Sequence, residues 1–371
     1  MIESPNLLVT VIAFLLLLGP LVVVHELGHY LVARLFGVKA DVFSVGFGKE
    51  LFGWNDRRGT RWRLSALPLG GYVQFAGDWN AISVPDEALA GMSEEERAYT
   101  FHAKPLWQRS LIVLAGPLTN LLFAVAIFAA FNMAFGKVEA TSEIAKFTED
   151  SAAQEAGLKL GDRIVAINGN EISNFYDIPP YVVPYPGKEI TIAIERDGRR
   201  TDVPVRIAEA VERDEFGNEA RIGRIGIYAG KVSLVPVGPV DAVALGFDQS
   251  IGIMRMMATG IGQIFSGERS IRELGGPIKI AKYSGEQLSL GWAQFVSFAA
   301  LISINLAFIN LLPIPALDGG HLAFYAAEAV RRKPLGLRSQ EWAYRTGLAL
   351  VLALMLFVTL NDLASLPVFG G

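Results

Sequence analysis

The 371-residue chain contains no cysteine, and this absence excludes disulfide bonds as a means of holding the fold together. Any metal site must therefore use histidine, aspartate or glutamate side chains. The chain also lacks a basic run that could bind a polyanion, and its formal net charge is −4. Neither feature indicates a nucleic-acid partner.

Charged residues are scarce as well. They make up 19% of the chain, whereas hydrophobic residues make up 51%, and the mean hydropathy is +0.36. This balance is too apolar for an ordinary soluble protein, so it indicates several membrane spans beside polar parts.

Four segments are long and apolar enough to cross a bilayer as helices: residues 7–24, 110–135, 293–312 and 343–360. The first lacks the basic start and the small-residue cleavage site of a signal peptide. We therefore interpret it as a retained span that continues as helix until about Gly37.

Lysine and arginine in short loops predict the direction of these spans. The segment 331–345 is rich in both and should be cytoplasmic, whereas the ends of the chain outside the first and last spans carry neither and should be external. The stretch 34–109 then becomes cytoplasmic and the stretch 136–292 external.

The sequence HELGH places His25, Glu26 and His29 inside the first apolar helix. Two histidines four residues apart share one helix face, with Cβ atoms roughly 6 Å apart, so both imidazoles can bind one tetrahedral zinc. Glu26 would lie near a water in the open coordination position and could take its proton. The alternative is a chance match that binds nothing, but three ionisable groups inside an apolar helix favour a functional site.

Two histidines and a water leave one ligand missing, and it must lie at the same depth. The third span runs in the same direction as the first and ends in NLLPIPALDGGH, where Pro313 and Pro315 should break the helix. We predict that Gly319 and Gly320 let the chain turn there. Non-helical backbone at this depth should be buried in protein or line a cavity.

Asp318 is the only acid in that segment, so we predict it as the third ligand. Two alternatives stay open: Asp318 could cap the following helix, or His321 could be the ligand, although His321 is better suited to orienting Asp318. Asn310, one helical turn before the break, could donate to a substrate carbonyl or an oxyanion, or could form an ordinary interhelical hydrogen bond. We interpret His102, in a polar loop, as a solvated histidine.

Three motifs and the order of elements resemble the site-2 protease family of intramembrane zinc metalloproteases, and within it the RseP-type bacterial branch. The motifs are HExxH at residues 25–29, AGPLTN at residues 115–120, and NxxPxPxxDG from Asn310 through Pro313, Pro315 and Asp318 to Gly319. The resemblance covers essentially the whole chain.

The resemblance implies one Zn²⁺ per chain, held by His25, His29 and Asp318, with Glu26 as general base and Asn310 beside the substrate. It also implies that Pro313 and Pro315 contact the substrate. The expected reaction is hydrolysis of a peptide bond within or near the transmembrane segment of single-span proteins, such as anti-sigma-factor-like regulators and remnant signal peptides. The expected place is the bacterial inner membrane, with an upstream periplasmic protease as a further partner.

Residues 38–109 should form a cytoplasmic-side loop with a β-hairpin and a Gly-rich turn. The matching segment of the family is a β-element that dips into the membrane. We predict that residues 62–74 offer a strand edge to an unwound substrate, with Gly70, Gly71, Tyr72 and Val73 as contacts. The alternative is an ordinary cytoplasmic hairpin.

The external stretch resembles a single PDZ domain of the bacterial, circularly permuted form, whereas the best-known family members carry two. Asn168-Gly169 and Asp197-Gly198 predict tight hairpin turns. The last strand, residues 223–229, should bind peptide termini through Gly223, Ile225, Gly226 and Ile227. A rigid plug that excludes bulky substrates is an equal alternative. An amphipathic helix after it should lie on the outer membrane surface or pack on the PDZ domain.

We therefore expect an α-helical polytopic membrane protein with four transmembrane helices, a membrane-associated β-hairpin element and one inserted β-rich PDZ domain. The expected parts are residues 1–37, 38–109, 110–135, 136–235 (PDZ), 236–292 (surface segment), 293–330, 331–342 (cytoplasmic loop), 343–361 and 362–371 (external tail).

Two other functions remain as alternatives to the protease. An inactive membrane PDZ adaptor would carry a vestigial motif, which the intact Glu26 and Asp318 disfavour. An ion transporter would use the same buried histidines and aspartate, and measured zinc content would distinguish it.

Overall fold

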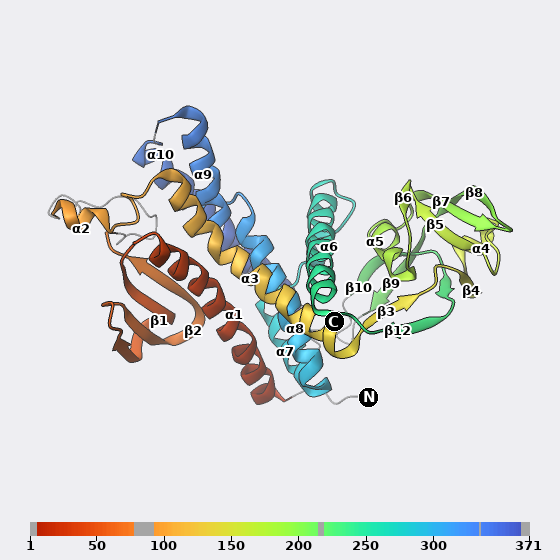
Figure 1. Ribbon diagram of the computed structural model, residues 1–371, viewed down its shortest axis with the longest axis horizontal. Coiled ribbons are helices and arrows are strands. Elements are labelled where there is room, and N and C mark those ends of the chain that lie inside the picture. The colour runs from red at the N-terminus through yellow and green to blue at the C-terminus, as the bar shows by residue number, and fades with distance from the viewer. Residues whose placement is uncertain (1–5, 78–92, 214–218, 334, 365–371) are drawn as a thin grey trace. The chain divides into compact units, whose positions relative to one another are not determined.

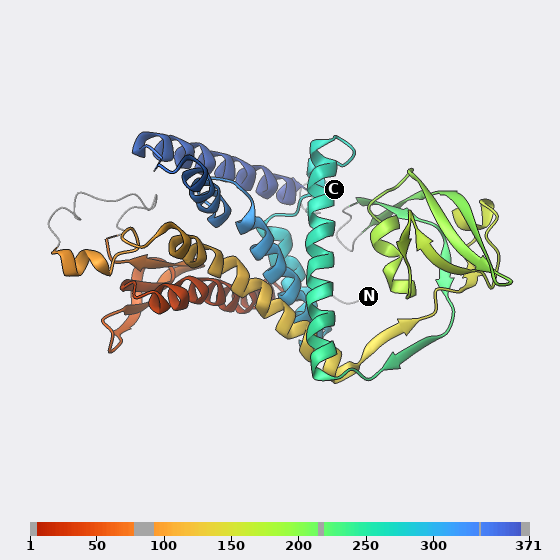
Figure 2. The same ribbon diagram turned by 45° about the horizontal axis from the view of Figure 1, so that its top comes forward.

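The computed structural model describes residues 6–77, 93–213, 219–333 and 335–364. Predictions for the first five residues and for the tail from residue 365 onward lie outside this range. The chain divides into two compact units (Figures 1 and 2). We call residues 1–127 and 275–360 the helical unit, and residues 128–274 and 361–371 the β-rich unit.

The described chain contains long helices at both ends and most of its strands in between. The helices are α1 (Leu7–Leu35), α2 (Glu94–Ala98), α3 (Leu106–Phe135), α4 (Ala152–Glu155), α5 (Pro179–Val182), α6 (Pro239–Phe265), α7 (Pro277–Leu290), α8 (Trp292–Leu311), α9 (Asp318–Arg331) and α10 (Leu337–Ala364). The strands are β1 (Ala40–Asn55), β2 (Arg61–Phe75), β3 (Lys137–Ala140), β4 (Ile144–Phe147), β5 (Arg163–Ile167), β6 (Asn170–Glu171), β7 (Glu189–Arg196), β8 (Arg199–Arg206), β9 (Ala208–Arg213), β10 (Glu219–Arg224), β11 (Ile227–Ala229) and β12 (Val232–Val235).

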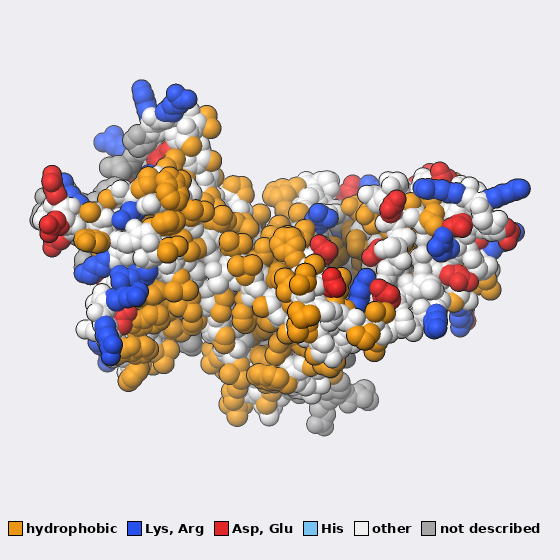
Figure 3. Space-filling model, in the orientation of Figure 1, with side chains coloured by type: hydrophobic (Ala, Val, Ile, Leu, Met, Phe, Trp, Pro, Cys, Tyr) orange, Lys and Arg blue, Asp and Glu red, His pale blue; other side chains and the backbone are white. Residues whose placement is uncertain are grey.

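Four helices are long and apolar enough to cross a membrane: α1, α3, α8 and α10. Each covers one of the predicted spans. Helix α1 ends at Leu35, just before Gly37, which has a positive φ of 71° and suits the end of a helix. Many of their large apolar side chains stay exposed, as expected of surfaces that face lipid, and Figure 3 shows hydrophobic side chains gathered over the helical unit.

Two apolar clusters hold the helical unit together along α1. One joins the first half of α1 to α8 through Leu17, Leu21 and Phe295, with Ile280 and Leu288 of α7 packed against it. The other joins the second half of α1 to β1, β2, α3 and α9. Leu27 of the HELGH segment packs against the second cluster.

The segment expected to lie on the membrane surface contains two helices that behave differently. Helix α7 packs against α1 and α8, and its place at the membrane surface stays a prediction. Its amphipathic pattern serves helix packing. Helix α6 instead contacts the β-rich unit, to which it belongs: Gln263 donates a hydrogen bond to the carbonyl of Pro184, and Glu268, just after the helix, pairs with Lys188. The PDZ-packing alternative therefore describes α6.

Strands β1 and β2 form the expected hairpin, which folds back on itself. Ser44 pairs with both Arg63 and Tyr72, while Trp54 pairs with Trp62. Residues 61–65 consequently lie between two segments of β1, and their edges are occupied. The predicted edge at residues 62–74 is thus wrong in its first half, because only the segment from Gly71 onward lies on the outside of this pairing.

The β-rich unit contains a four-stranded antiparallel sheet in the order β6-β5-β7-β8, together with the pairs β9–β10, β4–β11 and β3–β12. Alternating apolar residues of β5 and β7 bury Ile164, Ile192 and Ile194 in one aliphatic core. Both predicted tight turns are present, because Asn168-Gly169 and Asp197-Gly198 each have two successive positive φ angles.

Candidate metal centre

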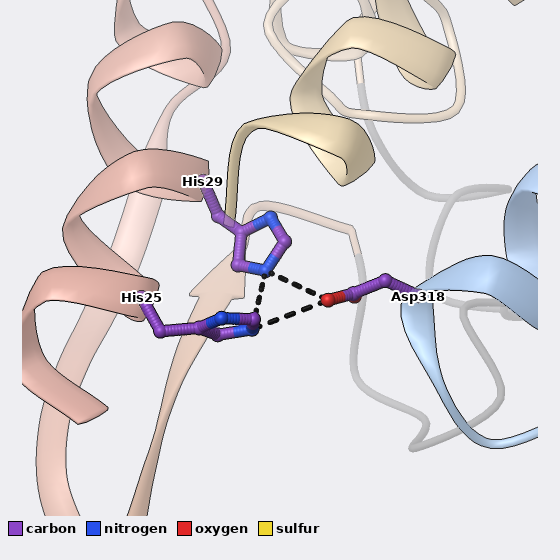
Figure 4. Close-up of side chains that lie close together, drawn as sticks. All are labelled: His25, His29 and Asp318. Atoms are coloured by element: carbon purple, nitrogen blue, oxygen red, sulfur yellow. Dashed lines mark hydrogen bonds and ion pairs between the residues drawn. The ribbon is translucent and has the colours of Figure 1, made fainter. Parts of the chain in front are cut away.

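Three side chains from two helices meet inside the helical unit (Figure 4). Helix α1 supplies His25 and His29 from one face, and the first turn of α9 supplies Asp318. The two Nε2 atoms are 3.2 Å apart, and Asp318 Oδ2 lies 3.2 Å from His25 Nε2 and 3.6 Å from His29 Nε2. The structure brings together all three residues that the sequence nominates as ligands.

The spacing of these three atoms suits a zinc ion. Ligands bound tetrahedrally at 2.0–2.1 Å are separated by about 3.3 Å, which matches the triangle of Nε2, Nε2 and Oδ2. Asp318 Oδ2 is buried and makes no hydrogen bond of good geometry. A buried carboxylate oxygen without a hydrogen bond is costly, and a cation would remove that cost.

Contacts behind the imidazoles come from α3. His29 Nδ1 lies 2.8 Å from the carbonyl oxygen of Ile112, and His25 Nδ1 lies 3.3 Å from Nδ2 of Asn120. A proton on His29 Nδ1 donated to this carbonyl leaves the Nε2 lone pair directed at the site. Helix α3 therefore orients at least one of the ligands.

Close approach of α3 to α1 depends on glycine. A Cβ added to Gly116 would lie 2.2 Å from His29 Nε2 and 2.9 Å from His25 Cε1. A Cβ added to Gly28 would lie 2.4 Å from the carbonyl oxygen of Ala115. The two helices thus meet at these glycines, and the imidazoles lie directly over Gly116.

The helix break that delivers Asp318 differs in detail from expectation. Helix α8 ends at Leu311 and α9 begins at Asp318, so Pro313 and Pro315 do lie in the break. The prediction that Gly319 and Gly320 supply the turn is wrong, since the positive φ falls on Ala316, at 84°. The glycines are instead needed for packing, because a Cβ on either would lie within 2.4 Å of a carbonyl oxygen of the preceding segment.

The contacts of Asp318 and His321 bear on the alternatives for the third ligand. The N-cap of α9 is Leu317, and the carboxylate of Asp318 contacts the imidazoles rather than capping its own helix. His321 lies in the same first turn of α9 but does not belong to the His25, His29 and Asp318 group of candidate ligands. Asn310 lies half-buried in the last turn of α8, just before the break. Its role as a substrate contact stays a prediction.

Glu26 lies beside the outer segment of β2. A Cβ on Gly71 would lie 3.2 Å from Glu26 Cγ, and the backbone of Val73 is within hydrogen-bonding reach of the Glu26 carboxylate. Tyr72 stacks on Phe47 and lies beneath the Arg63 guanidinium. Gly70 has a φ of 141°, which a residue with a side chain rarely adopts. The structure thus brings Gly71 and Val73 next to the predicted general base.

His102 is not the solvated histidine that the sequence suggested. It is half-buried, its Nε2 atom is inaccessible and makes no hydrogen bond, and its ring packs edge-on against Phe101. Burial and the nearby charge of Arg109 lower the pKa of His102 to about 4. Its imidazole is therefore neutral at pH 7.

The residues predicted to bind peptide in the β-rich unit are not one continuous strand. Gly223 lies in β10 and Ile227 in β11, and between them Gly226 has a positive φ of 73°. The side chain of Ile225 is only 4% exposed and belongs to the core, and its carbonyl accepts hydrogen bonds from Ser151 and Ala153. Within the described residues, β11 pairs with β4 alone.

Sequence reasoning missed two residues that contact the imidazoles, Gly116 and Asn120. Both belong to AGPLTN, which was noted only as a matching motif. One signal in the sequence could have identified them. An asparagine inside an uncharged span needs a hydrogen-bond partner, and Asn120 follows Gly116 by one helical turn, on the same face of the helix.

Comparison with known proteins identifies the family. Peptidase family M50 matches residues 13–354, and the chain belongs to this family. A relative from Rhizobium meliloti named "Putative zinc metalloprotease" is 45% identical over 96% of this chain and 97% of its own length. Metalloprotease MmpA of Caulobacter vibrioides is 36% identical over 98% of this chain and 97% of its own length. A solved PDZ domain of the SdrC-like protein from Listeria monocytogenes is matched by 24% of this chain and 84% of that domain, at 19% identity and a TM-score of 0.19.

The family and the names of its members define the class of protein. The chain is a metalloprotease, relatives that share most of its length are named zinc metalloproteases, and four of its described helices are long and apolar enough to cross a membrane.

Proposed function

We propose that this chain is an intramembrane endopeptidase with one zinc ion, which hydrolyses a peptide bond within or near the transmembrane segment of single-span membrane proteins. The observation that carries the proposal is the triangle of His25, His29 and Asp318: both histidines lie in α1, which is long and apolar enough to cross a bilayer, and Asp318 begins α9, directly after the break that follows the apolar helix α8. A protease that acted only on soluble peptides would have no need for ligands at that depth.

His25, His29 and Asp318 would hold the zinc ion. When bound, zinc supplies Lewis acidity, which polarises a substrate carbonyl and lowers the pKa of an attacking water. Glu26, next to the triangle, accepts the proton of that water and returns it to the leaving amine. Asn310, at the end of α8, would donate to the substrate carbonyl or to the developing oxyanion.

A helical substrate hides its peptide bonds, so it must be unwound before hydrolysis. The outer segment of β2, with Gly70, Gly71, Tyr72 and Val73, lies beside Glu26 and offers an extended partner for an unwound chain. Pairing would hold the scissile bond extended, next to the general base. Pro313 and Pro315 lie in the break that precedes Asp318, where they would contact the same substrate.

We further propose a bacterial inner-membrane location, with both chain ends periplasmic and the active site toward the cytoplasmic side. Helix α1 reaches His25 after 18 residues, which correspond to roughly 27 Å. The Lys- and Arg-rich segment 331–345, which runs from the end of α9 into the start of α10, supports the same direction.

The substrates we propose are anti-sigma-factor-like regulators and remnant signal peptides, trimmed first by an upstream periplasmic protease. The β-rich unit would act as a PDZ domain that binds peptide termini along β11, whose second edge has no strand partner among the described residues. A size filter that excludes untrimmed substrates is the competing role for this unit.

The decisive experiment compares the wild-type chain with Glu26→Gln in the membrane or in detergent. We expect Glu26→Gln to keep its zinc and to lose cleavage of a single-span test substrate, because only the proton acceptor is removed. Glu149→Gln, an exposed position of the β-rich unit, is the matched control and should cleave normally.

The outcomes separate the competing functions. Unchanged cleavage by Glu26→Gln would overturn the assigned role of Glu26. Wild-type protein that binds no zinc would argue against a protease and for a transporter. Wild-type protein that binds zinc without cleaving any single-span substrate would favour an adaptor.

A further inference from the structure

Asn120 is a fully buried polar residue that contacts the metal centre and that the proposed mechanism does not use. It lies in α3, is 0% exposed, and belongs to the AGPLTN motif. Its backbone carbonyl accepts a hydrogen bond of 2.8 Å from Ser303 of α8, which fixes the residue between two helices. A buried amide in an apolar helix is costly unless both of its polar ends are satisfied.

The nitrogen and the oxygen of this side-chain amide have different contacts. Nδ2 lies 3.3 Å from His25 Nδ1, whereas Oδ1 is buried and makes no hydrogen bond. In this arrangement the amide is the donor, so His25 Nδ1 is the acceptor and the imidazole proton lies on Nε2. The Nε2 atom that carries this proton lies 3.2 Å from Asp318 Oδ2.

Zinc binding requires the opposite tautomer of His25. A neutral imidazole that binds a metal through Nε2 carries its proton on Nδ1, and that proton needs an acceptor. A half-turn of the Asn120 amide exchanges its oxygen and nitrogen and places Oδ1 opposite Nδ1. The rotation gives the unsatisfied oxygen a donor and gives Nδ1–H an acceptor.

We propose that Asn120 is a positioning residue for His25, whose amide oxygen accepts the Nδ1–H of that ligand in the zinc-loaded protein. Asn120 then does for His25 what the Ile112 carbonyl does for His29. The two acceptors lie on α3 on either side of Gly116, over which both imidazoles pack. One face of α3 thereby fixes the orientation of both histidine ligands.

This inference rests on the proposed zinc site, and its test uses zinc affinity measured by competition with a chelator. Asn120→Leu removes both polar ends at similar volume, and we expect its affinity for zinc to fall about 10- to 100-fold. Asn120→Asp keeps an acceptor and loses the donor, so we expect it to hold zinc at least as tightly as wild type. Ser303→Ala is the control, because it removes a neighbouring hydrogen bond without touching the imidazole.

The Asn120→Asp variant decides between positioning and mere packing. If it loses zinc as severely as Asn120→Leu, the amide acts as a donor or as a filler, and the proposal is overturned. Wild-type protein that binds no zinc would instead contradict the proposed function, so the two failures are distinguishable.

A second measurement needs no variant. The chain contains four histidines, so the imidazole region of a ¹⁵N-histidine NMR spectrum is simple to assign. We expect zinc-loaded wild-type protein to show His25 protonated at Nδ1, with zinc on Nε2. Zinc on Nδ1 of His25 would overturn the proposal whether or not the variants fold.

Discussion

The helical unit and the β-rich unit both bury polar side chains, but they use them differently. In the β-rich unit, Asp162, Ser151 and Asn174 are at most 8% exposed, and each accepts a hydrogen bond from a nearby backbone N–H. These side chains close turns and cap helices. In the helical unit, Asn120 Oδ1 and Asp318 Oδ2 are buried without a hydrogen bond.

This difference indicates that the functional site lies in the helical unit. Folded proteins satisfy nearly all their buried polar atoms, so the exceptions need a reason. In the β-rich unit the buried polar groups serve the fold. Among the described residues, three buried oxygens of the helical unit lack a hydrogen bond, and two of them belong to the metal centre: Asp318 Oδ2 is a candidate ligand atom, and Asn120 contacts a candidate ligand, whereas the third is Asn305 Oδ1 of α8. A zinc ion, together with rotation of the Asn120 amide, would satisfy the two at the metal centre.

The largest effect is expected from a substitution that displaces α3, the helix that supports the imidazoles. Gly116→Ala places a Cβ 2.2 Å from His29 Nε2, so His29 or α3 must shift by about an ångström. Because such displacements at an active site cost on the order of 100-fold, we expect zinc affinity and cleavage to fall at least that much. Chelator competition and a single-span substrate assay measure the two effects.

The matched control is Gly19→Ala in α1, where an added Cβ has no atom within 4 Å. It should retain zinc and activity. Normal zinc binding by Gly116→Ala would mean that α3 does not pack on the imidazoles as the structure has it.

The next largest effect belongs to the core of the β-rich unit. Ile192 in β7 is 0% exposed, and Ile192→Ala should destabilise this unit by about 2–5 kcal/mol through the lost contacts and the cavity left behind. Zinc affinity of the full chain should stay within about twofold of wild type, since the ligands belong to the helical unit. Hydrogen exchange of strands β5 and β7 measures the first quantity.

Thr191→Ala, the exposed neighbour in the same strand, should change stability by less than about 0.5 kcal/mol. A large loss of zinc affinity in Ile192→Ala would show that the two units are coupled, and the contrast between them would weaken.

Much of the fold could be predicted because its signals are local. Uncharged apolar runs located α1, α3 and α8 to within a few residues, and Asn168-Gly169 and Asp197-Gly198 located two hairpin turns. The packing of α7 on α1 and α8 could not be predicted, because an amphipathic pattern is the same whether its apolar face meets lipid or another helix. The double pairing of β1 and β2 was also out of reach, since a Gly-rich hairpin does not specify its own register.

The residues of the candidate metal centre also differ in whether local sequence signals predict them. His25, Glu26 and His29 follow from spacing within one helix, and Asp318 follows from depth together with the broken helix. Gly116 and Asn120 contact the imidazoles only because α3 lies close to α1. The spacing of residues within α3 does not reveal that two helices meet there. His102 was misjudged for a related reason, because its burial depends on how its loop packs against neighbouring residues.

The smallest expected effect concerns how the β-rich unit uses a buried charge. The Asp162 carboxylate, 1% exposed, accepts two hydrogen bonds of 2.6 Å from Arg196 and one of 2.7 Å from the backbone of Lys159. Burial alone would raise the pKa of Asp162, but these hydrogen bonds and the charge of Arg196 outweigh it and lower the pKa. The stabilisation is therefore present above about pH 4, the unfolded value, and is lost as pH falls through the lower folded value.

Asp162→Asn should accordingly destabilise the β-rich unit by about 1–3 kcal/mol at pH 7, and the difference from wild type should shrink as the pH falls below about 4. Urea unfolding of strands β5 and β7, followed by pulsed hydrogen exchange at one labelling pH, measures this. Glu195→Gln breaks the exposed pair with Arg163, whose side chains are 39% and 58% exposed, and should cost less than about 1 kcal/mol at pH 7. If the two variants lost the same unfolding free energy, burial would not distinguish stabilising charges from neutral ones in this unit. The contrast with the helical unit would then rest on the metal centre alone.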